Sequence, residues 1–129
     1  MTEAEFKKRT KDIALRTINV VESLPRTRSA EVIGKQLLRS GTSVGANYRA
    51  ACRAKSAADI IHKLSIVEEE ADESLYWLEL LIDARLVPEQ KLSALYGDIN
   101  EIVSMTVASI KTLRAKKSGA NFANPKSKI

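Results

Sequence analysis

The sequence is poor in residues that punctuate β-structure and in residues that build disulfide, metal or nucleophilic sites. Five glycines and three prolines in 129 residues are too few for a β-sandwich or barrel, which needs a turn signal about every 8–12 residues. A single cysteine, Cys52, and a single histidine, His62, exclude a disulfide framework and a His/Cys metal cluster. No apolar run reaches the ~20 residues of a membrane span, and the charged first residues do not resemble a signal peptide. We therefore expect a soluble, cytoplasmic protein with reduced cysteine and no cofactor.

What the chain does contain is charge, and it is unevenly distributed. The net charge is +5. Residues 1–56 carry 12 basic and 5 acidic groups, whereas residues 57–85 carry 2 basic and 8 acidic groups. Residues 86–115 are balanced, and residues 116–129 carry four lysines and no acid. Such asymmetry bears on partners and assembly rather than on fold, although the segments can also be read simply as different solvated faces.

Apolar residues recur at spacings of three and four in four segments, which predicts four amphipathic helices. Leu24-Pro25 ends the first, because proline cannot continue a helix, and Ser56 is a cap for the third. Short connections make successive helices antiparallel neighbours, so the sequence predicts an all-α, up-down-up-down four-helix bundle over residues 1–116. Residues 117–129 have no period and are expected to form a disordered basic tail. The predicted helices span residues 3–24, 29–54, 56–85 and 88–116.

The middle of the second helix contains two glycines, Gly41 and Gly45. Each costs about 1 kcal/mol relative to alanine in a helix interior. Either the helix breaks there, with Ser43 as a new N-cap, or the glycines lie one turn apart so that another backbone can approach closely. The uninterrupted apolar phase across residues 33–51 favours a continuous helix.

Three polar residues, Ser43, Asn47 and Glu70, fall near the apolar stripes of the second and third helices. Polar groups at such positions are costly unless they are paired. One interpretation is a carboxylate–amide site; the favoured one is a buried polar network that fixes helix register, as a buried asparagine does in coiled coils. Paired catalytic carboxylates would have to converge in a cleft, whereas the acids of residues 68–73 are spread around the helix. The sequence therefore predicts no enzyme.

Tyr76 and Trp77 are neighbours and point about 100° apart on a helix. At most one of them can be central in the core, so the other is expected at a helix seam or an oligomer interface, where these residues are enriched. Cys52 lies among basic residues that would lower its pKa if the thiol is exposed, although a passive small side chain is the favoured interpretation.

Basic residues gather in three clusters that an up-down bundle brings to one end. Cations near helix C-termini complement the helix dipole, but this does not explain the cluster at the start of the first helix. A basic end would neutralise phosphates and bind RNA or DNA in a salt-dependent, sequence-tolerant manner. The rival hypothesis is a ring without nucleic acid, in which the basic face of one copy meets the acidic third helix of the next. The candidate nucleic-acid-binding residues are Lys7, Lys8, Lys11, Arg49, Arg53, Lys55, Arg114, Lys116 and Lys117.

Two stretches, residues 41–49 and 56–81, contain the motifs Ser-Val-x-Ala-Asn and Glu-Ser-x-Tyr-Trp-Leu. Together they resemble the bacterial four-helix-bundle family first named from open reading frames in intervening sequences of 23S rRNA genes. The resemblance covers residues 5–115 and implies a ring, commonly a homopentamer, without enzymatic activity. A related branch contains accessory proteins of diversity-generating retroelements, which implies nucleic acid and a reverse transcriptase as partners. This chain has Ala50 where many relatives have Glu, so a salt bridge made by that Glu does not carry over.

Overall fold

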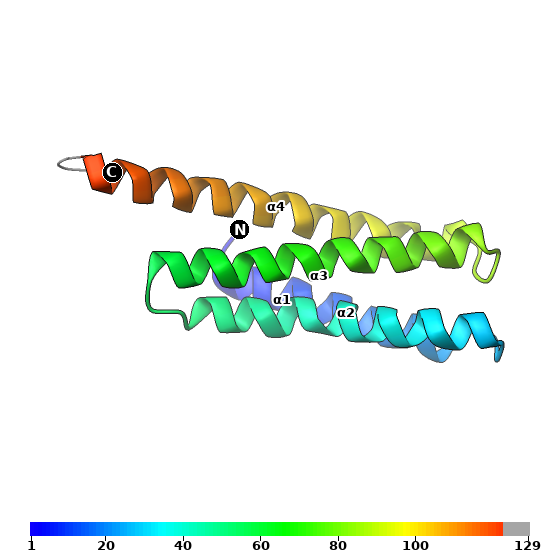
Figure 1. Ribbon diagram of the computed structural model, residues 1–129. Helices are drawn as coiled ribbons and strands as arrows, with labels where there is room; N and C mark the ends of the chain where they lie inside the picture. Colours follow the sequence, from blue (N-terminus) through cyan, green and yellow to red (C-terminus); the bar gives the residue numbers. More distant parts are fainter. Residues whose placement is uncertain (123–129) are drawn as a thin grey trace.

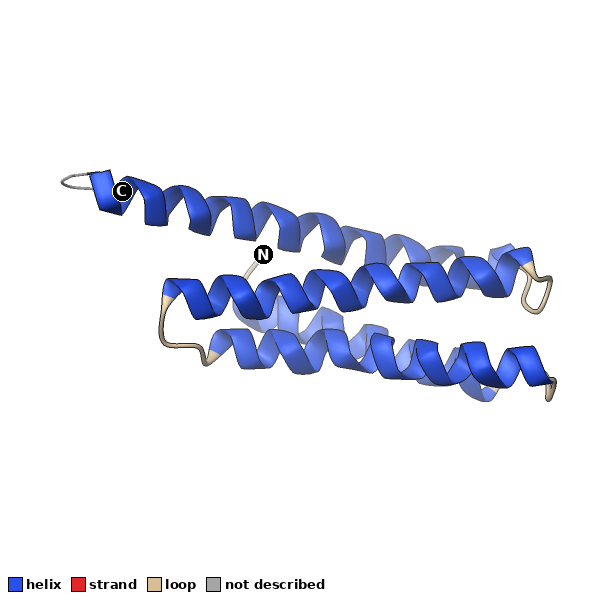
Figure 2. Ribbon diagram, viewed as in Figure 1, coloured by secondary structure: helices blue, strands red, loops and turns tan. Residues whose placement is uncertain are grey.

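The computed structural model describes residues 1–122, with side chains described up to residue 118. It contains four helices and no strand within these residues, which confirms the predicted all-α bundle (Figures 1 and 2). The helices are α1 (Glu3–Glu22), α2 (Arg28–Cys52), α3 (Ala57–Asp83) and α4 (Glu89–Phe122).

The helices run up and down, and each packs against the next along the chain (Figure 1). α1 and α4 also meet, but over a much smaller part of their length, so this is the most open seam of the bundle. The start of α1, the α2–α3 connection and the end of α4 lie at the same end of the molecule, which we call the α2–α3 end (Figure 1). The clusters of basic residues are therefore brought to one end, as the up-down topology predicts.

Local signals set most helix boundaries. Thr2 and Glu5 form a reciprocal capping box at the start of α1, and Thr27 caps α2. Ser56 accepts from the backbone N–H of Asp59 at 3.1 Å and caps α3 as expected. These caps satisfy amide groups that have no partner inside the helix.

The prediction for the end of α4 was too early, because the helix continues to Phe122 rather than stopping near residue 116. No proline or C-terminal glycine signal lies at residue 116, and the sequence had only the loss of apolar period to mark the end. Residues 123–129, the rest of the predicted tail, lie outside the described residues.

The main core runs along the bundle axis and draws on all four helices. Phe6 and Ile13 come from α1, and Leu37 and Val44 from α2. α3 and α4 contribute the larger share, with Val67, Ala71, Leu75, Leu78, Leu81, Leu92, Leu95, Ile99 and Ile102. Burial of such side chains contributes about 1.5–3 kcal/mol each, and it is the main force that holds the bundle together.

The two glycines of α2 lie in a continuous helix at a close crossing with α1, so a break at Ser43 is excluded. A Cβ atom at position 41 would lie 2.7 Å from Thr17 Cγ2 and 2.8 Å from Thr17 Oγ1. A Cβ atom at position 45 would lie 3.1 Å from Thr10 Oγ1. The absence of side chains at Gly41 and Gly45 therefore allows α1 to approach α2 closely.

Candidate functional site

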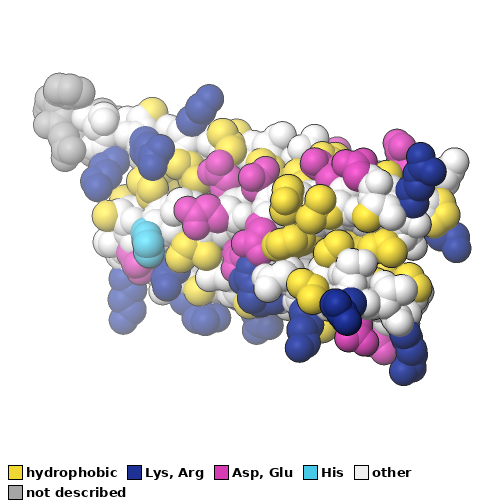
Figure 3. All heavy atoms as spheres, turned by 45° about the vertical axis from the view of Figure 1, so that its right-hand side comes forward, with side chains coloured by type: hydrophobic (Ala, Val, Ile, Leu, Met, Phe, Trp, Pro, Cys, Tyr) yellow, Lys and Arg dark blue, Asp and Glu magenta, His cyan; other side chains and the backbone are white. Residues whose placement is uncertain are grey.

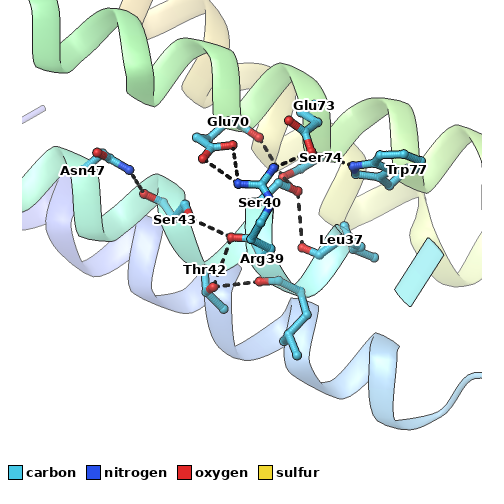
Figure 4. A network of polar contacts seen from close by, with 11 residues as sticks. Leu37, Arg39, Ser40, Thr42, Ser43, Asn47, Glu70, Glu73, Ser74 and Trp77 are labelled. Carbon is cyan, nitrogen blue, oxygen red and sulfur yellow. Dashed lines mark hydrogen bonds and ion pairs between the residues drawn. The ribbon is translucent and has the colours of Figure 1, made fainter. Parts of the chain in front are cut away.

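A polar network joins α2 to α3 near the middle of both helices (Figure 4). The Arg39 guanidinium donates to both Glu70 carboxylate oxygens, at 2.9 and 3.2 Å, and also to Glu73. Trp77 Nε1 donates to the same Glu73 carboxylate at 3.0 Å. The hydrogen bond from Trp77, followed by the one from Arg39, lowers the pKa of Glu73. The ionised form of Glu73 is thus favoured, and both carboxylates are bonded to one guanidinium, an arrangement suited to fixing the helices rather than to proton transfer.

Directly beneath this network lies a pair of buried serines, Ser40 and Ser74, which are fully inaccessible to solvent. Their Oγ atoms are 2.8 Å apart, and Ser74 Oγ is also 2.8 Å from the Glu70 carbonyl oxygen. Ser40 Oγ lies 3.3 Å from the carbonyl oxygen of Leu37. The two hydroxyls therefore satisfy each other and the helix backbone across the α2–α3 seam.

The residues that form this network are not the ones that the sequence predicted. Ser43 Oγ donates to the Arg39 carbonyl oxygen at 2.6 Å, and Asn47 Nδ2 donates to the Ser43 carbonyl oxygen at 2.9 Å (Figure 4). These bonds stay within α2, and neither side chain reaches Glu70. Both residues are only partly buried, which explains why backbone bonding suffices. The predicted set is corrected: Glu70 bonds Arg39, and the buried cross-helix pair is Ser40 with Ser74.

Tyr76 and Trp77 lie in different surroundings, and only one of them packs against the core. Tyr76 is 52% exposed, whereas Trp77 is partly buried and packs against the core. The two rings meet edge to face, with centroids 5.0 Å apart. Tyr76 is thus the member of the pair that is available to an oligomer interface.

The environment of Cys52 opposes the reactive alternative. Burial raises the pKa of its thiol, and the neighbouring Tyr48 and Lys7 compensate only in part. The Tyr48 ring lies against Phe6, with centroids 4.1 Å apart, and burial raises the pKa of its hydroxyl as well. A thiol held in its neutral form is a passive packing group.

Ion pairs separate the arginines that hold helices together from the cations that remain available. Arg9 pairs with Glu101 and Arg16 pairs with Asp98 at 2.6 Å, both across the α1–α4 seam. Arg39 is engaged at the α2–α3 seam. In contrast, Lys8, Lys11 and Arg49 form no ion pair within the described part of the chain. The sequence alone does not show which of these residues face a carboxylate.

Lys8, Lys11 and Arg49 lie around a groove between α1 and α2, with a volume of about 530 Å³. Its floor is made of small and hydroxyl side chains, because the two helices are close together at the α2 glycines. No acidic residue lines it. Its lining consists of Lys7, Lys8, Thr10, Lys11, Ala14, Thr42, Gly45, Ala46 and Arg49. We call this the α1–α2 groove.

The remaining candidate cations lie nearby in the fold but outside this groove. Arg53 caps the end of α2 and Lys55 follows in the connection to α3. Arg114, Lys116 and Lys117 are exposed on the last turns of α4, at the same end of the bundle (Figure 1). Acidic side chains gather in the middle of the face shown in Figure 3, and basic ones lie along both its lower and its upper edge. α3 carries eight acidic residues and one basic residue, so the charge asymmetry of the sequence is concentrated on this helix.

In the part of the chain that the structure describes, every helix is too short in apolar residues to span a bilayer. No group of three or more His, Cys, Asp or Glu residues in this part of the chain is placed to hold a metal ion.

Comparisons with known proteins place the chain in a family. No curated protein matches the sequence. A crystal structure of a protein of unknown function from the S23 ribosomal protein family of Bacteroides thetaiotaomicron is similar, with 39% identity and a TM-score of 0.79. The similarity covers 86% of this chain and 99% of that one. Residues 2–108 match the family described as 23S rRNA-intervening sequence protein. The four-helix bundle and the extent of this match show that the chain belongs to the 23S rRNA-intervening sequence protein family.

Proposed function

We propose that this protein is a non-catalytic nucleic-acid-binding protein that contacts RNA or DNA through the α1–α2 groove. The observation that carries the proposal is a groove lined by four cations and no carboxylate. Three of these cations, Lys8, Lys11 and Arg49, have no ion-pair partner among residues 1–118. Only Lys7 is engaged, by Glu3 at 3.3 Å on the solvent-exposed side of α1.

The chemistry of such a groove suits phosphates. Cations that neutralise phosphates release condensed counterions, so binding is favourable at low salt and weakens steeply as salt is added. Lysine and arginine side chains around small floor residues carry no pattern for reading base edges, so we expect little sequence preference. The acidic residues of α3 would repel a polyanion and thereby orient it toward α1 and α2.

The proposal is tested by titrating the protein against a fluorescently labelled oligonucleotide at several salt concentrations. The wild-type protein should bind with a strong inverse dependence on salt. The variant Lys8→Gln/Lys11→Gln/Arg49→Gln should lose about three of the released counterions and bind at least tenfold more weakly, a rough expectation for three lost phosphate contacts. Lys91→Gln is the matched control, because Lys91 lies in the first turn of α4 at the opposite end of the bundle. Equal binding by the triple variant and the control would refute the assignment.

A second candidate function is assembly of this protein with copies of itself, with a homopentameric ring as the specific expectation. The observation that favours it is the exposure of large apolar side chains on α1 and α2: Leu15 is 55%, Ile18 is 38% and Val32 is 57% exposed. On α3, Tyr76 is similarly exposed beside acidic residues. Joining a basic and apolar face to an acidic and aromatic face gives a heterologous contact, which closes into a ring when the rotation allows.

The assembly is tested by light scattering in low and high salt. A pentamer has five times the 14.2 kDa mass of the chain. Leu15→Gln/Val32→Gln should reduce the mass toward that of the monomer, since it removes apolar contacts and leaves the cations of the groove in place. A wild-type protein that is monomeric under all conditions would remove this candidate. The nucleic-acid proposal would be unaffected.

A further inference from the structure

The α1–α2 groove contains cations but no aromatic platform. Proteins that bind single strands without sequence preference combine a basic track with aromatic side chains on which bases stack. No aromatic residue lines the groove. Tyr48 precedes Arg49 in the sequence, but its ring lies on Phe6, which is only 7% exposed.

The other described aromatic side chains either form hydrogen bonds with acidic residues or lie on α3, away from the groove. Trp77 donates to Glu73 at 3.0 Å, and Tyr96 donates to Glu79 at 2.7 Å. Tyr76 is exposed, but it lies on α3, the helix with the greatest excess of acidic residues. Among residues 1–118, therefore, no ring is available to stack a base beside the cations.

The floor of the groove also offers no free hydroxyl donor to an unstacked base. It is formed by Ala14, Gly45 and Ala46, with the hydroxyls of Thr10 and Thr42. Thr10 Oγ1 is already bonded to the Lys7 carbonyl oxygen at 3.1 Å, and Thr42 Oγ1 to the Leu38 carbonyl oxygen at 2.7 Å. The hydroxyl protons are thus used by helix backbone, and the cations at the rim are the donors left to bind a phosphate.

We propose that the α1–α2 groove binds the phosphate backbone of a double helix rather than a single strand. This inference rests on the proposed function and specifies its ligand. A duplex keeps its bases stacked inside and presents phosphates at high charge density. A site with cations and no stacking surface contacts only the phosphates, so its affinity does not depend on access to the bases. A single strand bound here would lack the base stacking that provides much of the affinity in proteins with aromatic platforms. DNA and RNA duplexes both have such a phosphate backbone, so both are possible ligands.

The experiment compares labelled DNA and RNA duplexes with unstructured single strands of the same length, by anisotropy at matched salt. We expect a duplex to bind about tenfold more tightly than either single strand at low salt. For three neutralised phosphates per chain, one for each groove cation without an ion pair, the slope of log K against log salt should be about −2.7 for a DNA duplex. The DNA and RNA arms show which duplex the groove prefers.

The groove itself is tested with the variant Lys8→Gln/Lys11→Gln/Arg49→Gln and the control Lys91→Gln. The triple variant should lose the preference for duplex and reduce the slope by about three, while the control keeps both. Binding of single strands as tightly as duplexes would overturn the inference and leave the proposed function standing. Failure of every oligonucleotide to bind at low salt would overturn both.

Discussion

The crossing of α1 and α2 can be tested by adding one methyl group at a time to glycines in different surroundings. At Gly97, in the interior of α4, a new Cβ would meet nothing within 4 Å. At Gly41 it would lie 2.7 Å from Thr17 Cγ2 and 2.8 Å from Thr17 Oγ1. Both substitutions to alanine gain about 1 kcal/mol of helix propensity, so the difference between them isolates the close approach.

The expected magnitudes follow from this contrast. Gly97→Ala should raise the free energy of unfolding by about 1 kcal/mol. Gly41→Ala should lower it by about 1 kcal/mol, because overpacking costs roughly 1–3 kcal/mol and a β-branched threonine on a helix has little freedom to rotate away. The two melting temperatures should differ by roughly 8 °C, at about 4 °C per kcal/mol for a chain of this size.

Thermal and urea denaturation followed by circular dichroism would measure both variants. A double-mutant cycle with Thr17→Ala tests the cause, because that change removes both of the atoms nearest to the new methyl group. In the Thr17→Ala background, the penalty of Gly41→Ala should shrink by about 1–2 kcal/mol. The reasoning fails if Gly41→Ala stabilises the protein as much as Gly97→Ala does, or if its penalty is undiminished when Thr17 is alanine.

Three further changes test other features of the bundle. Thr17 Oγ1 is buried without a hydrogen-bond partner, so Thr17→Val should raise the free energy of unfolding by about 1 kcal/mol in urea denaturation; a loss of stability would show that the hydroxyl is satisfied. Arg85 has φ of 61° in the turn after α3, so Arg85→Gly should raise the melting temperature by a few degrees, a gain of about 0.5–1 kcal/mol; no change would mean that the turn relaxes. The folded-state pKa of Glu73 lies below its ordinary value of 4.5, so its contribution is present above that value and is lost as pH falls through the lower folded-state pKa. Glu73→Gln should therefore cost about 0.5 kcal/mol at neutral pH and less near pH 3, followed by the fluorescence of Trp77; an equal cost at both values would contradict the assignment.

Much of the fold could be read from local signals. Ser56 and the Leu24-Pro25 pair set helix boundaries because capping and proline geometry act within a few residues. The spacing of apolar residues fixed which face of each helix is buried, and the phase across residues 33–51 correctly favoured a continuous α2. The end of α4 was missed, because residues 117–122 carry no apolar period although they continue the helix.

The candidate site was less predictable. Ser43 and Asn47 were expected to pair with Glu70, yet they bond the backbone of their own helix. Ser40 and Ser74 form the buried pair instead, and the signal that could have found them is their position on the two facing apolar stripes. For Cys52, a passive small side chain was the favoured interpretation, and the burial that raises the pKa of its thiol agrees with it.

The sequence by itself determined the number of helices, their order, the up-down topology and the end at which basic residues gather. These depend on periodicity, caps and short connections, all of which act locally along the chain. Only the tertiary structure decided which cations remain available. Arg9, Arg16 and Arg39 face carboxylates across helix seams, whereas Lys8, Lys11 and Arg49 face a groove. The physical reason is that pairing depends on the rotation and separation of helices distant in sequence, and here the glycines of α2 set that separation.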